Sequence, residues 1–270
     1  MEGDGMKTRS RRRETLREQF RAHKALTVVY FLMRLAVLLV LVASILERDY
    51  HAVFYCLITL LLFLVPTFVE RRIKIEVPDL LHILILLFIF AAQILGEIRE
   101  YYLTFPYWDA MLHTITGFLA AAIGFAFIDI WNSSEHAAMK LSPLFAAVFA
   151  FCFSMTVGVL WEFFECFMDL TFHTDMQKDT VIPAVSSVLL NPEGHNVVVT
   201  VPVEELTLGD VTFDGYLDVG LRDTMKDLFV NFLGALVFSV IGFFYVKKRG
   251  KSRFLRQIMP RKKAEKSERQ

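Results

Sequence analysis

The feature of this sequence that most limits its fold is the gathering of its apolar residues into six blocks. Each block approaches the roughly 20 residues that an α-helix needs to cross the hydrocarbon core of a membrane. A helix satisfies its own backbone hydrogen bonds, which makes it the element expected at that depth. The sequence therefore predicts an all-α integral membrane protein, a six-transmembrane-helix bundle with spans at about 26–46, 51–69, 78–96, 108–131, 142–165 and 226–246.

The distribution of positive charge predicts the orientation of this bundle. If both termini are cytoplasmic, 23 of the 29 Lys and Arg residues lie on the cytoplasmic side. They fall in a basic N-terminal segment (1–25), the connections 70–77 and 132–141, and a basic tail (247–270). Because positive residues are retained in the cytoplasm, we expect a multi-pass plasma (cytoplasmic) membrane protein with cytoplasmic N- and C-termini. The tail could lie against anionic lipid headgroups; a topology signal alone is the simpler interpretation.

Between spans five and six lies an extracytoplasmic loop, 166–225, with ten acidic and two basic residues. The runs Val197–Val201, Leu206–Leu208 and Val211–Phe213 are typical of short strands, and Gly209-Asp210 suits a two-residue turn. We expect a small β-hairpin within this loop. It would cap the membrane domain (26–246) and would not form a domain of its own.

The remaining composition excludes several classes of protein. The three cysteines are scattered and form neither a disulfide framework nor a CxxC metal motif. The first apolar block is too long, and lacks the small-residue cleavage pattern, for a cleavable signal peptide. The partners we expect are membrane lipids and not nucleic acid, and the sequence leaves the oligomeric state and the substrate open.

Ionisable residues within or beside the spans are the first candidates for function. At the bilayer centre each one costs about 2.5–3.5 kcal/mol. Span four begins with Asp109 and carries His113 four residues later, so both lie on one helix face. Asp109 alone is explained by the helix dipole. His113 lies one turn deeper, where a helix cap does not account for it.

Span five ends with three carboxylates on one helical stripe. Glu162, Glu165 and Asp169 are offset by three and seven residues. The C-terminal end of a helix disfavours negative charge. These acids therefore need a partner, which is a cation, a metal ion or a bound proton.

Span six repeats polar residues at four-residue spacing, with Asp223, Asp227 and Asn231 on one face. Small residues follow in Gly234 and Ala235, and span four carries Gly117 and Gly124. Such residues allow membrane helices to approach closely. We therefore expect these positions to be helix-packing residues that bring spans four to six together.

The predicted topology puts all three polar faces at the same extracytoplasmic depth. Carboxylates with one His and one Asn suit Mg²⁺, Mn²⁺ or Ca²⁺, and Zn²⁺ is also compatible. The alternative is a hydrogen-bonded polar cluster that only fixes helix register. The candidate polar or metal site is Asp109, His113, Glu162, Glu165, Asp169, Asp223, Asp227 and Asn231.

The order of these motifs carries a family resemblance. They are Asp109…His113…Gly117, then Trp161-Glu162-x-x-Glu165, then Asp223-Thr224-Met225-x-Asp227…Asn231…Gly234-Ala235. This order resembles the YjdF-type family of bacterial inner-membrane proteins, and it is more distantly similar to the VanZ-like group. The resemblance covers roughly residues 78–246. It implies the same topology and site residues and, through the VanZ-like group, a role in the cell envelope or in the response to glycopeptides. It implies no reaction.

Three functions fit these observations. The first is an envelope-related multi-pass membrane protein of unassigned biochemical activity, with a carboxylate-rich extracytoplasmic site that could bind a metal. The second is a metal-dependent membrane-embedded enzyme acting on a lipid-linked or envelope substrate; the sequence has no HExxH motif and few positive charges on the outer side to hold a phosphate. The third is a cation or proton transporter component, although the polar residues gather at one face and no inverted repeat is evident.

Overall fold

The structure is a computed structural model that describes residues 24–73, 75–133, 139–247 and 257–262. The predicted six spans are confirmed, each by a helical stretch long and apolar enough to cross a membrane. They are α2 (Lys24–Glu47), α3 with α4 (Tyr50–Leu62, Val65–Ile73), α5 with the π-helical η1 (Asp79–Phe90, Ala91–Ile98), α7 (Trp108–Asn132), α8 (Pro143–Phe172) and α9 (Leu221–Lys247). The expectations for the basic segments 1–25 and 247–270 fall largely outside the described residues.

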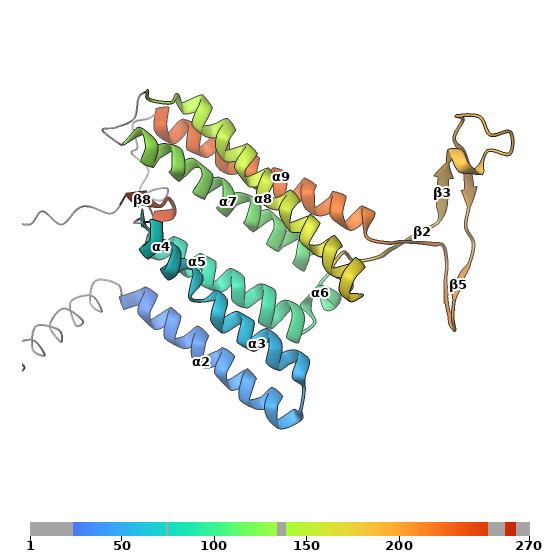
Figure 1. The fold of residues 1–270 in the computed structure, drawn as a ribbon, viewed down its shortest axis with the longest axis horizontal. Helices are drawn as coiled ribbons and strands as arrows, with labels where there is room; N and C mark the ends of the chain where they lie inside the picture. The colour runs from blue at the N-terminus through green and yellow to red at the C-terminus, as the bar shows by residue number, and fades with distance from the viewer. Residues whose placement is uncertain (1–23, 74, 134–138, 248–256, 263–270) are drawn as a thin grey trace, which may run out of the picture.

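The helices form two groups (Figure 1). α7, α8 and α9 pack on one another along much of their length, and they bury one apolar core around Phe125 and Phe238. α2, α3 and α5 with η1 form the second group, whose own core includes Phe63 and Leu86. The short helix α6 (Tyr101–Thr104) connects the end of η1 to α7. The three helices that carry the predicted polar faces are therefore neighbours.

Small residues set the close packing of α7 with α8 and α9. A Cβ atom added at Gly117 would meet the backbone carbonyl of Asn231, and one added at Gly234 would meet that of Thr114. Gly124 lies against Phe153 and Ala150 of α8. Ala235 is fully buried. Because the backbones of these helices lie so close together, the polar side chains one or two turns before the glycines can approach one another.

The second span is broken at residues 63–64, just before Pro66. A proline lacks an amide hydrogen, and its ring crowds the carbonyl four residues earlier, which is where α3 ends. The hydroxyl of Tyr30 on α2 donates to the carbonyl oxygen of Phe63 at 2.8 Å. This bond satisfies a backbone group that the interruption would otherwise leave without a helical partner.

Helices α8 and α9 extend beyond the spans predicted for them, to Phe172 and from Leu221. The segment between them holds short antiparallel ribbons, which confirms the predicted hairpin-containing loop. β5 (Leu206–Leu208) and β6 (Val211–Phe213) pair as expected, with Leu208 opposite Val211 across the two-residue turn. The other strands are β2 (Thr180–Ile182), β3 (Ala184–Ser187), β4 (Val199–Pro202) and β7 (Tyr216–Asp218), which pair as β2–β7 and β3–β4, with the short 3₁₀ helix η2 (Val188–Leu190) after β3.

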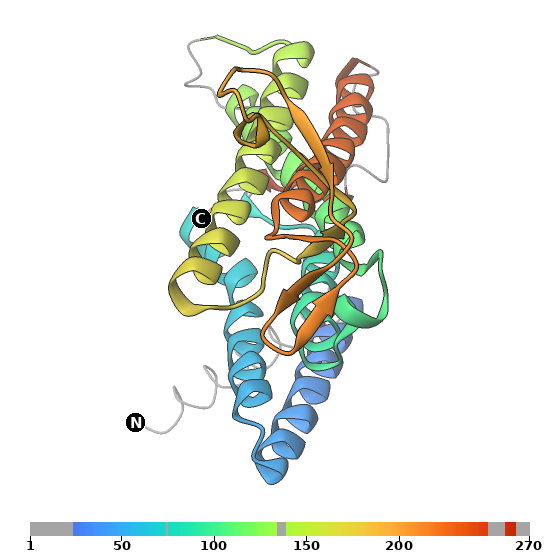
Figure 2. The same cartoon turned by 90° about the vertical axis from the view of Figure 1, so that its right-hand side faces the viewer.

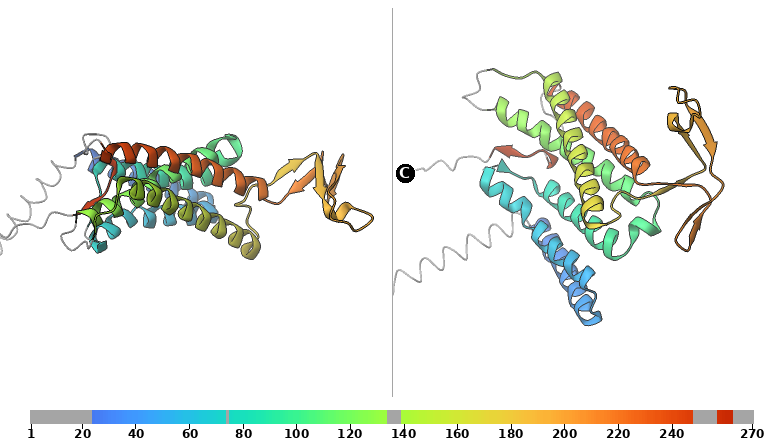
Figure 3. Two further views of the ribbon diagram at one scale, coloured as in Figure 1. Left: turned by 90° about the horizontal axis from the view of Figure 1, so that it is seen from above. Right: turned by 45° about the vertical axis from the view of Figure 1, so that its right-hand side comes forward.

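These ribbons project away from the ends of α8 and α9 (Figures 1 and 3), and they lie in front of the helices when the molecule is viewed from that end (Figure 2). We call this end of the bundle the loop end. The first described residues of α2 lie at the opposite end, together with β8 (Arg261–Lys262). β8 pairs with β1 (Ile75–Glu76) between the second and third spans. Just before β8, Ile258 and Met259 are buried in the core of α7, α8 and α9.

Candidate metal centre at the loop end

Helix α7 presents Asp109 and His113 on one face at the loop end. Asp109 lies in the first turn, where the helix dipole favours a negative charge. Its Oδ1 lies 3.5 Å from Nε2 of His113, one turn along the same helix. The imidazole is buried, and the Asp109 side chain is 22% exposed. The exposed side of the pair is therefore that of Asp109.

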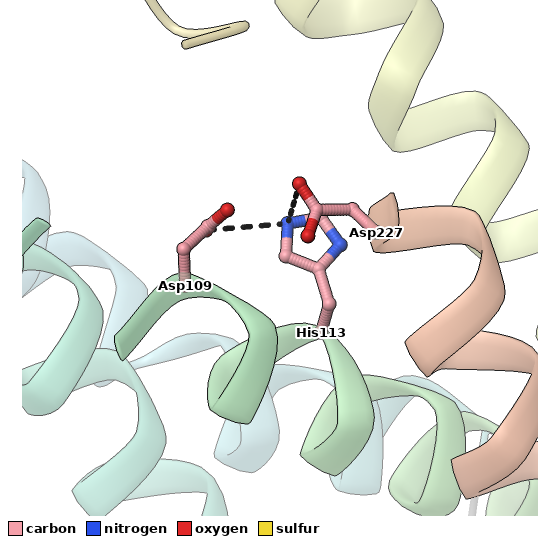
Figure 4. Close-up of side chains that lie close together, drawn as sticks. All are labelled: Asp109, His113 and Asp227. Atoms are coloured by element: carbon pink, nitrogen blue, oxygen red, sulfur yellow. Dashed lines mark ion pairs between the residues drawn. The ribbon is translucent and has the colours of Figure 1, made fainter. Parts of the chain in front are cut away.

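Helix α9 places Asp227 near the same ring nitrogen of His113. Its Oδ2 lies 3.9 Å from Nε2 of His113, and the residue is only 1% exposed (Figure 4). The packing at Gly117 and Gly234 produces this approach because it removes the side chains that would hold α7 and α9 apart. Asp109 and Asp227 therefore face the same nitrogen from two helices.

Helix α8 approaches the other side of the imidazole. Oε1 of Glu162 lies 3.7 Å from Nδ1 of His113, and Glu162 is 4% exposed. Glu165, one turn later, is also buried, and its Oε1 accepts a 2.8 Å hydrogen bond from Nε1 of Trp161. The two nitrogens of His113 thus face carboxylates that come from different helices.

These side chains form two overlapping groups of possible metal ligands. One is Asp109, His113 and Asp227, and the other is His113, Glu162 and Glu165. In each group one ligand atom per residue lies within 4.8 Å of the others. Since His113 belongs to both, one nitrogen can bind a metal while the other donates a hydrogen bond to a carboxylate.

Several buried oxygens in this cluster lack a hydrogen-bond donor. Neither carboxylate oxygen of Glu162, nor Oδ1 of Asp227, is hydrogen-bonded within the described part of the chain. A buried polar group without a partner is costly, and a buried charge is more so. These oxygens are therefore suited to bind a cation or to carry a proton.

Lys226 also belongs to the cluster, a position that was not predicted from the sequence. Its Nζ lies 2.6 Å from Oδ1 of Asp223, 3.7 Å from Oδ1 of Asp227 and 3.9 Å from Oδ2 of Asp109. The three-residue spacing from Asp223 was the one signal for this position. The side chain is 45% exposed, so the ammonium lies at the mouth of the site.

Asp169 is not brought into the cluster. Its Oδ1 accepts hydrogen bonds from the hydroxyl of Thr174 and the backbone amide of Met176, and its Oδ2 accepts one from the amide of Gln177. Asp223 of α9 makes a similar bond, in which its Oδ2 accepts a 2.9 Å hydrogen bond from the backbone amide of Lys178. The two aspartates hold residues 176–178 between the ends of α8 and α9.

Asn231 lies one turn below Asp227 at a junction of three helices. Its Nδ2 is 3.5 Å from the carbonyl oxygen of Ser154, and it fills the space that the absent side chain of Gly158 leaves. The hydroxyl of Ser154 donates to the carbonyl of Gly117 at 2.8 Å. Asn231 therefore forms the floor of the site, and Ser154 and Gly158 are packing positions that the sequence analysis did not identify.

Tyr102 follows the third span and flanks the site. Burial raises the pKa of its phenol, and the carboxylates of Asp109 and Glu97 raise it further. The hydroxyl therefore stays protonated at neutral pH and remains able to donate a hydrogen bond.

Comparison with known proteins agrees with this architecture. No curated protein and no solved structure matches the chain. A family model described as "Predicted membrane protein (DUF2238)" matches residues 29–248, from the first turns of α2 to the end of α9. The chain thus belongs to the DUF2238 family of membrane proteins.

Proposed function

We propose that this protein is a multi-pass envelope membrane protein that binds a divalent cation through Asp109, Nε2 of His113 and Asp227. The observation that carries the proposal is the convergence of these groups from α7 and α9 on one ring nitrogen, beside buried carboxylate oxygens without a donor. A cation bound there supplies positive charge to Asp227, whose Oδ1 has no hydrogen-bond donor within the described residues.

Charge balance calls for added positive charge in this cluster. Asp109, Glu162, Glu165, Asp223 and Asp227 gather around one imidazole and one ammonium. In a low-dielectric site this excess of carboxylates is compensated by bound protons or by a metal ion. Two carboxylates and one imidazole suit Mn²⁺ or Zn²⁺ better than Ca²⁺, which prefers six to eight oxygens. Mg²⁺ binds through few protein ligands and is the third candidate.

Glu162 has a separate role in this proposal. Metal-bound histidines commonly donate their second ring N–H to a carboxylate, which fixes the tautomer and the ring orientation. Glu162 faces Nδ1 while the two aspartates face Nε2. The three-helix arrangement thus supplies both the ligands and the group that orients one of them.

We place the site at the extracytoplasmic face of the plasma membrane. The excess of Lys and Arg in the opposite connections and the two termini supports this orientation. Within DUF2238, the motif order supports the YjdF type, and the similarity to VanZ-like proteins favours a function in the cell envelope.

Lys226 favours one particular activity, a metal-dependent enzyme acting on a lipid-linked or envelope substrate. The small number of Lys and Arg residues in the outer connections is the argument against such an enzyme. With a divalent cation bound beside it, the ammonium at the mouth of the site would complete a pair of positive groups able to bind a phosphate oxygen.

The direct test is metal analysis of the purified protein and of two variants. We expect a bound divalent cation in the wild type and its loss in Asp227→Asn, which keeps the size of the side chain. Asp169→Asn is the control because Asp169 is an acid on the same helix stripe as Glu162 but lies outside the cluster. A wild type that binds no metal, or equal metal contents in all three proteins, contradicts the proposal.

A further inference from the structure

An apolar groove with a volume of about 420 Å³ lies between the two helix groups. Its lining includes Leu84 of α5, Ile115 and Phe118 of α7, and Leu233 and Val237 of α9. Its lining is apolar apart from Thr114, whose hydroxyl is already bonded to the carbonyl of Ala110. The groove therefore has no group to recognise a polar ligand.

The groove starts directly below the candidate metal centre. Thr114 and Ile115 follow His113 on α7, and Leu233 comes six residues after Asp227 on α9. At 1.5 Å per residue, the groove begins about 1.5 Å beyond His113 on α7, at Thr114, and reaches about 15 Å beyond Asp227 on α9, at Val237. A polar end and an apolar channel thus follow one another along the same two helices.

The open side of the groove faces hydrocarbon. Ile115, Leu233 and Val237 are between 36% and 51% exposed, and all three lie well inside membrane spans. The natural occupant of an apolar groove at this depth is a lipid chain. Above the groove, a divalent cation held by the proposed centre would, together with Lys226, provide positive charge at the level of a lipid headgroup.

We propose that the site binds a lipid with a phosphate-bearing headgroup, whose phosphate reaches the metal and Lys226 while its hydrocarbon chain occupies this groove. The inference rests on the proposed metal centre. Without the cation, the carboxylates of Asp109, Glu162 and Asp227 repel a phosphate. Binding of the lipid phosphate is therefore strictly dependent on the metal.

A second apolar groove provides a matched control. It lies between α8 and α9 and includes Val240 and Phe244, and it contains none of the residues of the metal centre. Val240 is 47% exposed and Val237 is 51% exposed, on the same helix three residues apart. Val237→Trp and Val240→Trp therefore add the same bulk to similar lipid-facing positions, and only the first fills the groove below the site.

The experiment uses the full-length protein in phosphatidylcholine nanodiscs containing a photoactivatable phosphatidic acid, with a diazirine in its acyl chain. Crosslinked residues are mapped by mass spectrometry with Mn²⁺ and with EDTA. We expect Mn²⁺-dependent adducts on α7 between residues 114 and 119. In Val237→Trp the lipid chain can no longer occupy the groove, and we expect these adducts to fall about tenfold or more. In Val240→Trp we expect them to be unchanged. Ile115→Trp, on the facing helix, repeats the test if Val237→Trp fails to fold.

Three outcomes overturn the inference. Equal labelling of both grooves means that bulk lipid occupies them. Labelling unaffected by Val237→Trp or by EDTA means that the groove and the metal do not act together. Displacement of the probe by inorganic phosphate at equal concentration means that the headgroup alone is recognised. Metal content measured on the same samples separates the two proposals: metal without groove labelling removes only this inference, whereas absence of metal removes both.

Discussion

His113 and Glu162 face each other across the interface of α7 and α8, with Nδ1 of the imidazole 3.7 Å from Oε1 of the carboxylate. The opposite ring nitrogen faces Asp109 and Asp227. This arrangement gives Glu162 a role that differs from the role of the two aspartates.

Glu162→Gln is predicted to weaken the binding of the metal without abolishing it. An orienting carboxylate typically contributes about 10- to 100-fold to metal affinity. We expect a weakening of that size for Mn²⁺ or Zn²⁺ in a titration against a competing chelator. Glu193→Gln, an exposed acid in the loop, is the control. An unchanged affinity in Glu162→Gln would show that Glu162 does not orient the imidazole.

Gly234→Ala is predicted to lower the stability of the bundle more than Gly242→Ala does. A Cβ at Gly234 meets the backbone of Thr114 and Phe118, whereas one at Gly242 meets only the ring of Phe125. A backbone cannot move aside without separating the helices, and overpacking typically costs about 1–3 kcal/mol. Thermal unfolding in detergent measures the difference, and equal melting temperatures for the two variants would contradict it.

Asp169→Asn is predicted to loosen the stem of the loop and leave the metal content unchanged. The carboxylate accepts hydrogen bonds from the backbone amides of Met176 and Gln177, at 2.7 and 2.8 Å. Bonds from an amide to a charged acceptor contribute about 1.5–3 kcal/mol. Hydrogen exchange of these two amides should accelerate accordingly, while helix amides of α8 near Ser154 keep their protection. Unaltered exchange at both amides would argue against this anchoring.

Single cysteines are predicted to report opposite sides of the membrane at positions 198 and 139. Cys56, Cys152 and Cys166 are first replaced by serine or alanine. Val198 in the loop and Met139 between α7 and α8 are both exposed. With the proposed orientation, an impermeant maleimide labels Val198→Cys in intact cells, and it labels Met139→Cys only after permeabilisation. The reverse pattern would overturn the orientation and the extracytoplasmic position of the site.

The sequence was sufficient to predict the spans and the meeting of Asp109, His113 and Asp227. Hydrocarbon permits few backbone conformations, so apolar blocks of the right length identify helices. The helical period then assigns each polar residue to a face, and the small residues Gly117 and Gly234 indicate which faces meet.

Other features were not predictable from local patterns. The carboxylates that Lys226 contacts depend on the relative rotation of α7 and α9, since its long side chain can extend toward acids of either helix. Asp169 has the spacing of a site residue but bonds to an irregular segment. The burial of Ile258 and Met259 depends on β8 pairing with β1, almost two hundred residues away in sequence. Two apolar residues in a basic tail show no periodicity.

The position of α7 has a consequence for how the protein is made. It is the least apolar and the most buried of the six spans, and much of that burial is against α9. About ninety residues separate the end of α7 from the start of α9. At 5–20 residues per second, the ribosome needs roughly 5–20 s to supply them. During that interval His113 and the glycine face of α7 lack their final partner in the bilayer. A chain that stops before α9 therefore presents a polar surface to lipid, which is a physical mark by which membrane quality control can recognise an unfinished molecule.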